Sequence, residues 1–393
     1  MFSDIIKQRI EKFYPKGVAL RHHLHQYPEL SEHEVETARL VADTLREYGI
    51  ETRQGIAGNG VLGIIRGKQA GKTVLLRADM DALAVQEAAD VAYQSKRPGI
   101  MHACGHDGHT AGLLMAAMAL SELQDHIPGT IKLMFQPAEE TVGGAQRMIQ
   151  AGILENPRVD GAFGCHLWGQ TPEGMVWVKS GPVMAAPDEF RITLIGRGGH
   201  GALPHLVVDP VLMAAQVIQQ FQTIVSRRKN PLDPAVVSIC RIHGGETYNV
   251  IPQEVQMRGT IRTFSQELRD FIPQEMDRIL QGITLAAGGS YTLELHKRFP
   301  PLINDPAATE LVRRAAEKIL GPQNVMEAAQ ANMGGEDFAY IAQEVKASFF
   351  FVGIAKGETP VIHHSPYFQW DDSVLSIAAS CLCQVALDFL HAP

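Results

Sequence analysis

The segment at residues 100–112, IMHACGHDGHTAG, gathers one cysteine and three histidines into a short stretch of chain. A cysteine two residues before a histidine suits two different kinds of enzyme. Cys104 could be a nucleophile with His106 as its base, or both side chains could be ligands of a metal ion. The rest of the sequence decides between these interpretations.

Further metal-ligand residue types follow short apolar runs that are typical of buried parallel strands. Open α/β sheets bind ligands beyond the carboxyl ends of their strands, so these side chains should meet at one edge of a sheet. The runs at 73–78, 130–135, 161–165 and 348–352 precede, in turn, Asp79 and Asp81, Glu139 and Glu140, His166, and His363 and His364.

This convergence favours a metal centre. A thiolate, imidazoles and a carboxylate suit Zn²⁺, Co²⁺, Ni²⁺ or Mn²⁺ better than Mg²⁺ or Ca²⁺. A thiolate can also bridge two ions, and paired ions act together on the attacking and leaving groups of a hydrolysis. A cysteine hydrolase needs only Cys, His and an orienting group, which leaves the acidic pairs and His166 without a task. Without a metal centre, the residues of five separate segments would each need an unrelated structural role.

The bulk composition is that of a soluble globular protein of two domains, with 393 residues, 45% hydrophobic residues and a net charge of −8. An acidic balance does not attract phosphate backbones or anionic lipid, so we expect neither nucleic acid nor membrane as a partner. The first residues lack the apolar core of a signal peptide. Five cysteines without a framework spacing fit a reducing compartment, and we therefore expect a cytoplasmic location.

Alternating strand and helix signals predict an α/β catalytic domain, with a mixed, mainly parallel central sheet flanked by helices. Its helices are expected at 31–49, where Ser31 and Glu34 have the spacing of a capping box, at 108–123 and at 371–390. Between them, residues 187–298 read as strand, helix, two strands, helix and strand, an α+β unit in which Asp209 and Pro210 mark a helix start. We therefore assign 1–186 and 299–393 to the catalytic domain and 187–298 to an inserted domain.

Seven motifs resemble, in order and spacing, the metal-dependent aminoacylase, hippurate hydrolase and auxin-conjugate amidohydrolase family, with carboxypeptidase G and succinyl-diaminopimelate desuccinylase as more distant relatives. The resemblance covers nearly the whole chain and implies two metal ions, Zn or Mn with Co or Ni as alternatives, and an inserted lid that forms a homodimer or homotetramer. The motifs are RADMDAL, MHACGHDGHTA, QPAEE, GCHLWGQ, GRGGHGALPH, MGGEDFA and HHSPYF.

Matching these motifs assigns roles to individual residues. Cys104 stands at the bridging ligand, Glu139 at the general base for metal-bound water, and His200 at a histidine that polarises the scissile carbonyl, often from the partner subunit. Asp81 is expected to support the site from behind the ligands, together with Asp79. The remaining ligands are His106, Glu140, His166 and His364, with His363 as the alternative to His364, and the substrate-binding residues are Asn249, Arg262, Gly334 and Gly335.

The function that follows is hydrolysis of N-acyl-L-amino acids, such as hippurate or N-acetyl amino acids, into a carboxylic acid and an amino acid. A small-peptide metallopeptidase or carboxypeptidase would use the same site, and a catalytically silent metal-binding scaffold is a remoter alternative. Gly196, Gly198 and Gly201 also spell a dinucleotide-binding fingerprint, but Pro204 stands where its helix should open. A nucleotide cofactor is therefore not expected.

Overall fold

The computed structural model describes residues 2–141, 143–357 and 359–392, which form two compact units. The larger unit comprises 1–181, 303–330 and 337–393, and the smaller comprises 182–302 and 331–336. The insert expected at 187–298 lies within the smaller unit, which also includes a six-residue segment from much later in the chain.

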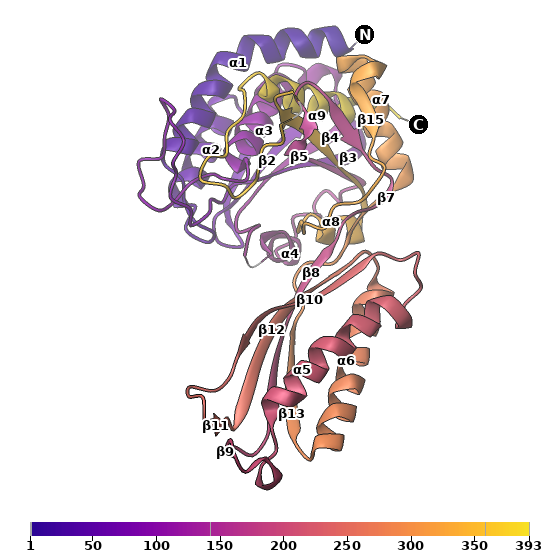
Figure 1. Ribbon diagram of the computed structural model, residues 1–393. Helices are drawn as coiled ribbons and strands as arrows, with labels where there is room; N and C mark the ends of the chain where they lie inside the picture. The colour runs from indigo at the N-terminus through magenta and orange to yellow at the C-terminus, as the bar shows by residue number, and fades with distance from the viewer. Residues whose placement is uncertain (1, 142, 358, 393) are drawn as a thin grey trace. The chain divides into compact units, whose positions relative to one another are not determined.

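The larger unit is built on an eight-stranded mixed sheet in the order β1-β2-β4-β3-β5-β16-β6-β15, with parallel pairing from β4 through β16 (Figure 1). Its elements are α1 (Phe2–Gln26), α2 (Val35–Glu47), β1 (Glu51–Ile56), β2 (Gly60–Arg66), β3 (Gln69–Asp79), α3 (His106–Ser121), η1 (Gln124–His126), β4 (Pro128–Gln136), α4 (Gly144–Gln150), β5 (Gly161–Pro172), β6 (Val176–Val178), α7 (Pro306–Leu320), η4 (Pro322–Asn324), β15 (Val325–Glu327), α8 (Ala339–Glu344), β16 (Lys346–Ala355) and α9 (Val374–His391), with β7 (Gly181–Met184) and β14 (Leu302–Asn304) at the unit boundaries.

Helices cover this sheet as the α/β pattern predicts. α3 and α9 lie against β3 and α1 packs over both helices, while α4 and α8 contact each other and the strands β4 and β16 (Figure 1). α3 is buried from its first residue to Leu120 and is apolar on all sides after its polar first turns, which is typical of a central core helix. Within the described part of the chain, α9 alone is long and apolar enough to cross a membrane, and it is mostly buried against α1, α3 and α7.

The smaller unit has a four-stranded antiparallel sheet in the order β10-β12-β8-β13, packed against two helices. Alternate residues of β8, including Phe190 and Leu194, point into the core formed with α5 and α6. Asp209 caps α5 by accepting hydrogen bonds from Val211 and Leu212, as its position before Pro210 predicts. Its elements are β8 (Ala186–Ile195), β9 (Gly199–His200), η2 (Pro204–Leu206), α5 (Pro210–Thr223), η3 (Ile224–Arg228), β10 (Ala235–His243), β11 (Val250–Ile251), β12 (Glu254–Thr263), α6 (Gln266–Ala287) and β13 (Ser290–His296).

Two sequence predictions in the larger unit are wrong. The capping box does not form, because α2 begins only at Val35 and the side chains of Ser31 and Glu34 bond elsewhere. The strand expected to end at Cys165 continues to Pro172 because it keeps pairing with β16 beyond His166. His166 therefore lies within β5 and not after it.

A buried ion network ties α1 to the first turn of α3. His25 is 2% exposed, and its Nδ1 lies 2.9 Å from Asp107 Oδ2 while its Nε2 lies 3.1 Å from Glu87 Oε1. Arg21 lies 3.3 Å from the same Asp107 oxygen and stacks on Trp370. This network fixes the helix start that carries the neighbouring His106.

The network makes stability depend on pH. Burial lowers the pKa of His25, but Asp107 and Glu87 outweigh it and raise the pKa from 6.5 to about 9. The raised folded-state pKa means that His25 contributes its full stabilisation below about pH 6.5 and loses it as the pH rises through about 9. Urea unfolding of the metal-free protein should therefore show the stability advantage of the wild type over His25→Gln shrinking by about 3 kcal/mol between these limits. Parallel stability curves for the two proteins would contradict this assignment.

Candidate metal centre

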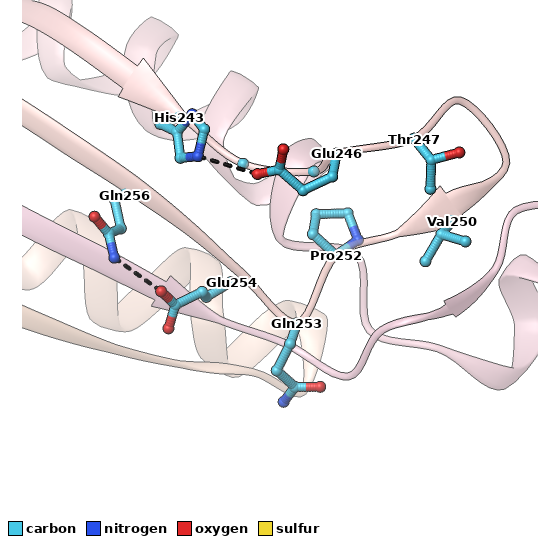
Figure 2. Close-up of a pocket in the computed structure, with 10 residues that line it drawn as sticks. His243, Glu246, Thr247, Val250, Pro252, Gln253, Glu254 and Gln256 are labelled. Atoms are coloured by element: carbon cyan, nitrogen blue, oxygen red, sulfur yellow. Dashed lines mark hydrogen bonds and ion pairs between the residues drawn. The ribbon is translucent and has the colours of Figure 1, made fainter.

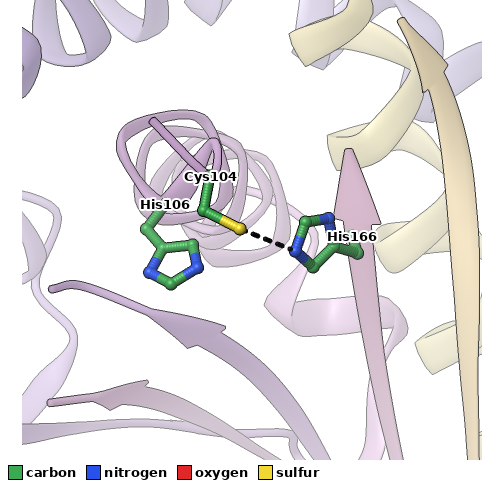
Figure 3. Close-up of side chains that lie close together, drawn as sticks. All are labelled: Cys104, His106 and His166. Carbon is green, nitrogen blue, oxygen red and sulfur yellow. Dashed lines mark hydrogen bonds between the residues drawn. The ribbon is translucent and has the colours of Figure 1, made fainter. Parts of the chain in front are cut away.

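The five predicted metal ligands converge on one place in the larger unit. The ligand atoms of Cys104, His106 and His166 all lie within 4.8 Å of one another, with Cys104 Sγ 3.5 Å from His166 Nε2 (Figure 3). The ligand atoms of Cys104, Glu140 and His364 meet the same limit. Cys104 belongs to both groups, which is the position that a bridging thiolate requires.

Four separate stretches of backbone bring these ligands together. Cys104 and His106 flank Gly105, whose φ of 94° turns the chain into α3. Glu140 lies in the turn after β4, His166 points out of β5, and His364 lies in the segment that follows β16. The parallel strands β3, β4, β5 and β16 all point their carboxyl ends to this edge of the sheet.

Hydrogen bonds from the histidine rings fix which nitrogen faces the centre. His106 Nδ1 lies 2.9 Å from the carbonyl oxygen of Asp81, and His166 Nδ1 lies 2.7 Å from that of Leu167. A carbonyl oxygen only accepts, so both Nδ1 atoms donate and each Nε2 presents a lone pair to the centre. This is the arrangement that orients a histidine ligand of a metal.

The contacts of the ring nitrogens also distinguish His364 from His363. His363 Nε2 accepts a hydrogen bond from the Gly169 amide at 3.0 Å, so its proton is on Nδ1, which lies 3.9 Å from Cys104 Sγ. His364 Nε2 lies 3.2 Å from Glu140 Oε1, and its backbone has a φ of 61°, a left-handed conformation that is uncommon outside glycine. His364 therefore has the geometry of a ligand and His363 that of its support.

Asp79 and Asp81 lie next to the ligands and accept hydrogen bonds from neighbouring residues. Asp81 accepts hydrogen bonds at Oδ2 from Ser31 Oγ at 2.6 Å and from the Glu140 amide at 3.1 Å. Asp79 Oδ1 accepts from His109 Nδ1 at 2.6 Å, and His109 Nε2 in turn accepts from the Leu167 amide. Both ring nitrogens of His109 are thus engaged away from the centre.

The electrostatics of the centre favour cations. Burial and the carboxylates of Glu140 and Glu139 raise the pKa of the Cys104 thiol well above its ordinary value. Burial alone would lower the pKa of His106, but Asp79 and Asp81 raise it to about 10. Glu140 Oε1 is buried and accepts no hydrogen bond among the described residues. A thiol, imidazoles and a buried carboxylate oxygen in this arrangement fit divalent metal ions, which would displace the protons.

Glu139 lies beside the ligands. Its side chain is 6% exposed, and one of its carboxylate oxygens lies within 4.8 Å of ligand atoms of His106 and Glu140. The amide of Asp337 is directed at Glu139 Oε1 at 3.4 Å. A carboxylate held next to a candidate metal centre is in a position to accept a proton.

Sequence reasoning missed the residues that hold this arrangement. The Arg77 guanidinium donates to Asp79 at 2.7 Å, to Asp337 at 2.8 Å and to Gln136 at 2.8 Å, all inside the larger unit. Burial raises the pKa of Asp337 to about 6 although Arg77 lowers it. Arg77, Gln136 and Asp337 lie inside the motifs RADMDAL, QPAEE and MGGEDFA, but the motifs alone do not indicate a role for them.

The remaining predicted residues lie in the smaller unit, in two groups. His200 on β9 pairs with Val250 on β11, which places it beside Asn249, and both side chains are exposed. Arg262 Nε donates at 3.2 Å to the carbonyl of Met333, next to Gly334 and Gly335.

Gly335 has a packing reason to lack a side chain, because a Cβ there would lie 2.5 Å from Pro187 Cγ. A cavity of about 320 Å³ also lies in this unit, but none of the ten residues drawn in Figure 2 is a predicted site residue. Two of its polar side chains, His243 and Glu246, face each other at 3.4 Å.

Comparison with known proteins agrees with this centre. Residues 75–388 match the peptidase family M20/M25/M40. The chain is 45% identical over 305 residues to an N-acyl-L-amino acid amidohydrolase of Geobacillus stearothermophilus, covering 77% of this chain and 82% of that protein. It is 42% identical over 371 residues to an N-acetyl-L-cysteine deacetylase of Bacillus subtilis, covering 94% and 87%.

A solved structure of a dinuclear metal binding peptidase of the M20 family from Bacillus subtilis superposes with a TM-score of 0.86 at 33% identity, covering 98% of this chain and all of that one. The family resemblance stated from the motifs is thereby confirmed. The chain belongs to the M20 peptidase family and is a metal-dependent hydrolase of amide bonds.

Proposed function

We propose that this protein hydrolyses N-acyl-L-amino acids to a carboxylic acid and a free amino acid. The observation that carries the proposal is the pair of ligand groups that share Cys104, with the carboxylate of Glu139 beside them. Two relatives at 42% and 45% identity carry names that describe deacylation of such compounds. The preferred acyl group depends on the shape of the substrate pocket.

The residues that would hold two divalent ions are Cys104, His106, Glu140, His166 and His364. When bound, Zn²⁺ or Mn²⁺, with Co²⁺ or Ni²⁺ as alternatives, supply Lewis acidity that acidifies water and polarises the amide carbonyl. Asp81 keeps the proton of His106 on Nδ1 through its carbonyl oxygen, so that Nε2 remains a ligand.

Glu139 is the proton carrier in this proposal. Its carboxylate accepts the proton of the attacking water and then donates it to the nitrogen of the departing amino acid. The Asp337 amide at 3.4 Å helps to orient the carboxylate for both transfers. His200 donates a hydrogen bond to the carbonyl oxygen, since its Nδ1 accepts from the Ala202 amide and its proton is therefore on the exposed Nε2.

Arg262 is the proposed partner of the substrate carboxylate. Its Nε and Nη1 are held by backbone carbonyls of Met333 and Ile261, and its Nη2 donates no hydrogen bond within the residues that the structure describes. Burial lowers the pKa of Arg262, yet a guanidinium stays protonated at neutral pH. A guanidinium that is held in place and has a donor available is well suited to bind a carboxylate.

Two copies of the chain are needed to complete this substrate site. In the smaller unit Arg262 pairs with Pro187 at the start of β8, whereas Glu254 pairs with Ile195 at its end, beyond which His200 lies (Figure 1). These two ends of β8 are about 26 Å apart at ~3.3 Å per residue. One small substrate cannot contact both groups from the same copy, so we assign His200 and Asn249 to the site of a partner subunit.

The surface of the smaller unit supports such a dimer. α5 contains no charged residue, and its exposed face includes Val211, Leu212 and Ile218. Depletion of charge on an exposed helix face is typical of the core of a protein interface. β10 next to it is an edge strand whose last four residues are exposed. The five cysteines are all free thiols, which supports the proposed cytoplasmic location.

Substitutions at the centre separate catalysis from metal binding. Glu139→Gln should keep the metal content of the wild type but lower kcat by about 10²- to 10⁴-fold, because only the proton carrier is lost. Cys104→Ser should lose both metal and activity. The assay is release of amino acid from N-acetyl-methionine and hippurate after loading with Zn²⁺ or Mn²⁺, with metal content measured by elemental analysis. Glu36→Gln, on the exposed face of α2, is the matched control.

Normal turnover by Glu139→Gln would rule out Glu139 as the proton carrier. A full metal complement in Cys104→Ser would rule out the role of its thiolate as a shared ligand. Cleavage of N-blocked dipeptides without cleavage of any N-acyl amino acid would favour a carboxypeptidase. A fully loaded wild-type protein that cleaves no amide would favour a metal-binding scaffold.

Hybrid dimers test the contribution of the partner subunit. His200→Ala and Glu139→Gln should each be inactive alone, but a mixture refolded or exchanged together should recover up to about a quarter of wild-type activity. Random mixing makes half of the dimers hybrid, and each hybrid contains one intact site. Activity that stays at the level of the separate variants would place His200 in the site of its own subunit.

A further inference from the structure

The turn that carries Glu139 and Glu140 has an unfavourable backbone conformation. Ala138, the residue before Glu139, has a φ of 56°. The left-handed region is disfavoured for L-residues, by about fivefold or more in population relative to ordinary conformations. Such outliers persist only where surrounding contacts hold them, and they concentrate at functional sites.

A buried carboxylate holds this residue in place. Glu34 Oε1 accepts a hydrogen bond from the Ala138 amide at 2.8 Å, and the Glu34 side chain is fully buried. The same oxygen accepts from the Glu32 amide at 3.0 Å, and Oε2 accepts from Asn59 Nδ2 at 3.1 Å. The carboxylate is thus itself fixed from three directions and can act as a rigid support.

The other side of the turn is held by the same stretch of chain. Ser31 Oγ donates to Asp81 Oδ2 at 2.6 Å, and that oxygen also accepts from the Glu140 amide at 3.1 Å. Glu34 is the N-cap residue of α2, but its side chain makes no capping hydrogen bond, and Ser31 Oγ is directed at Asp81 instead. The Glu34 carboxylate instead accepts from the Ala138 amide, and Ser31 is linked to the Glu140 amide only through Asp81 Oδ2, which accepts from both groups.

We propose that Glu34 is a positioning residue, whose carboxylate holds Ala138 in the left-handed conformation and thereby directs Glu139 and Glu140 into the metal centre. The proposal rests on the proposed roles of these two glutamates. Glu34 touches neither ligands nor substrate, so its effect must pass through the backbone of the turn. A merely structural Glu34 would affect stability without affecting the geometry of Glu139.

The test is a double-mutant cycle between residues 34 and 138. Glu34→Ala should lower kcat about 10- to 100-fold with KM changed less than about threefold, and should weaken Zn²⁺ binding through Glu140. Ala138→Gly alone should change kcat by less than about twofold. In the Glu34→Ala background, however, Ala138→Gly should restore kcat about fivefold, because glycine enters the left-handed region without the penalty of alanine.

Two further variants keep the test decisive. Glu34→Gln retains an oxygen acceptor for the Ala138 amide and should keep kcat within about threefold of the wild type, even if Glu34→Ala folds poorly. Glu36→Gln and Glu36→Ala, on the exposed face of α2, are matched controls that should leave kcat and Zn²⁺ affinity unchanged. Additive effects of the two substitutions, or a loss of melting temperature in Glu34→Ala with unchanged kcat and Zn²⁺ affinity, would overturn the proposal.

Structural and binding readouts keep this test separate from that of the proposed function. A crystal structure of Glu34→Ala should show Ala138 outside the left-handed region and the Glu139 carboxylate displaced. The d–d absorption of the Co²⁺-loaded variant should change as Glu140 is displaced. If the wild type cleaved no amide at all, the proposed function would fail, while an unchanged Ala138 φ and an unchanged Co²⁺ spectrum would independently refute the role of Glu34.

Discussion

Ionisable groups are buried together where β3, β4, β5 and β16 end, and that concentration of charge is stable only if cations neutralise it. Asp79 and Asp81 are almost fully buried, and Glu139 and Glu140 lie next to them. Arg77 pairs with Asp79, while the carboxylates of Asp81 and Glu140 lie beside the rings of His106 and His364. Buried carboxylates are costly unless their charge is compensated, and coordination of a metal is one way to compensate for it. The buried carboxylates of the larger unit therefore favour the binding of divalent ions at this edge of the sheet.

Hydrogen bonds from surrounding groups fix the orientation of the histidine rings at this centre. Carbonyl oxygens set the proton positions of His106 and His166, and a backbone amide occupies the Nε2 of His363. Two of these contacts use the backbone of β5 and the third uses the segment that follows β3, so the protein itself orients these rings. Preorganisation of this kind is what allows a small shift of a supporting residue to matter for catalysis.

The chemistry of the site could be predicted from the sequence because residue type and the rule for strand ends suffice for it. Apart from His166, which lies within β5, the ligand residues lie in segments outside the strands, and the long strands of the larger unit lie close to where the hydrophobic pattern places them. The roles of Ser31 and Glu34 could not be predicted, since their spacing is that of a helix cap and only the tertiary fold brings the 137–140 turn against them. The length of β5 was also hidden, because pairing with β16 and not local sequence extends it past His166. The HHSPYF motif already favours His364 over His363, and the hydrogen bond from the Gly169 amide to His363 is consistent with that choice.

Sharing of the Cys104 sulfur by two ions is the central feature of the proposed centre, and anomalous diffraction from crystals loaded with Zn²⁺ measures it directly. Data collected at the zinc edge should show two peaks per chain, both about 2.3 Å from Cys104 Sγ. One peak should lie near His106 or His166, and the other should lie near Glu140 or His364. A single peak, or two peaks beyond bonding distance of that sulfur, would contradict the shared-thiolate centre.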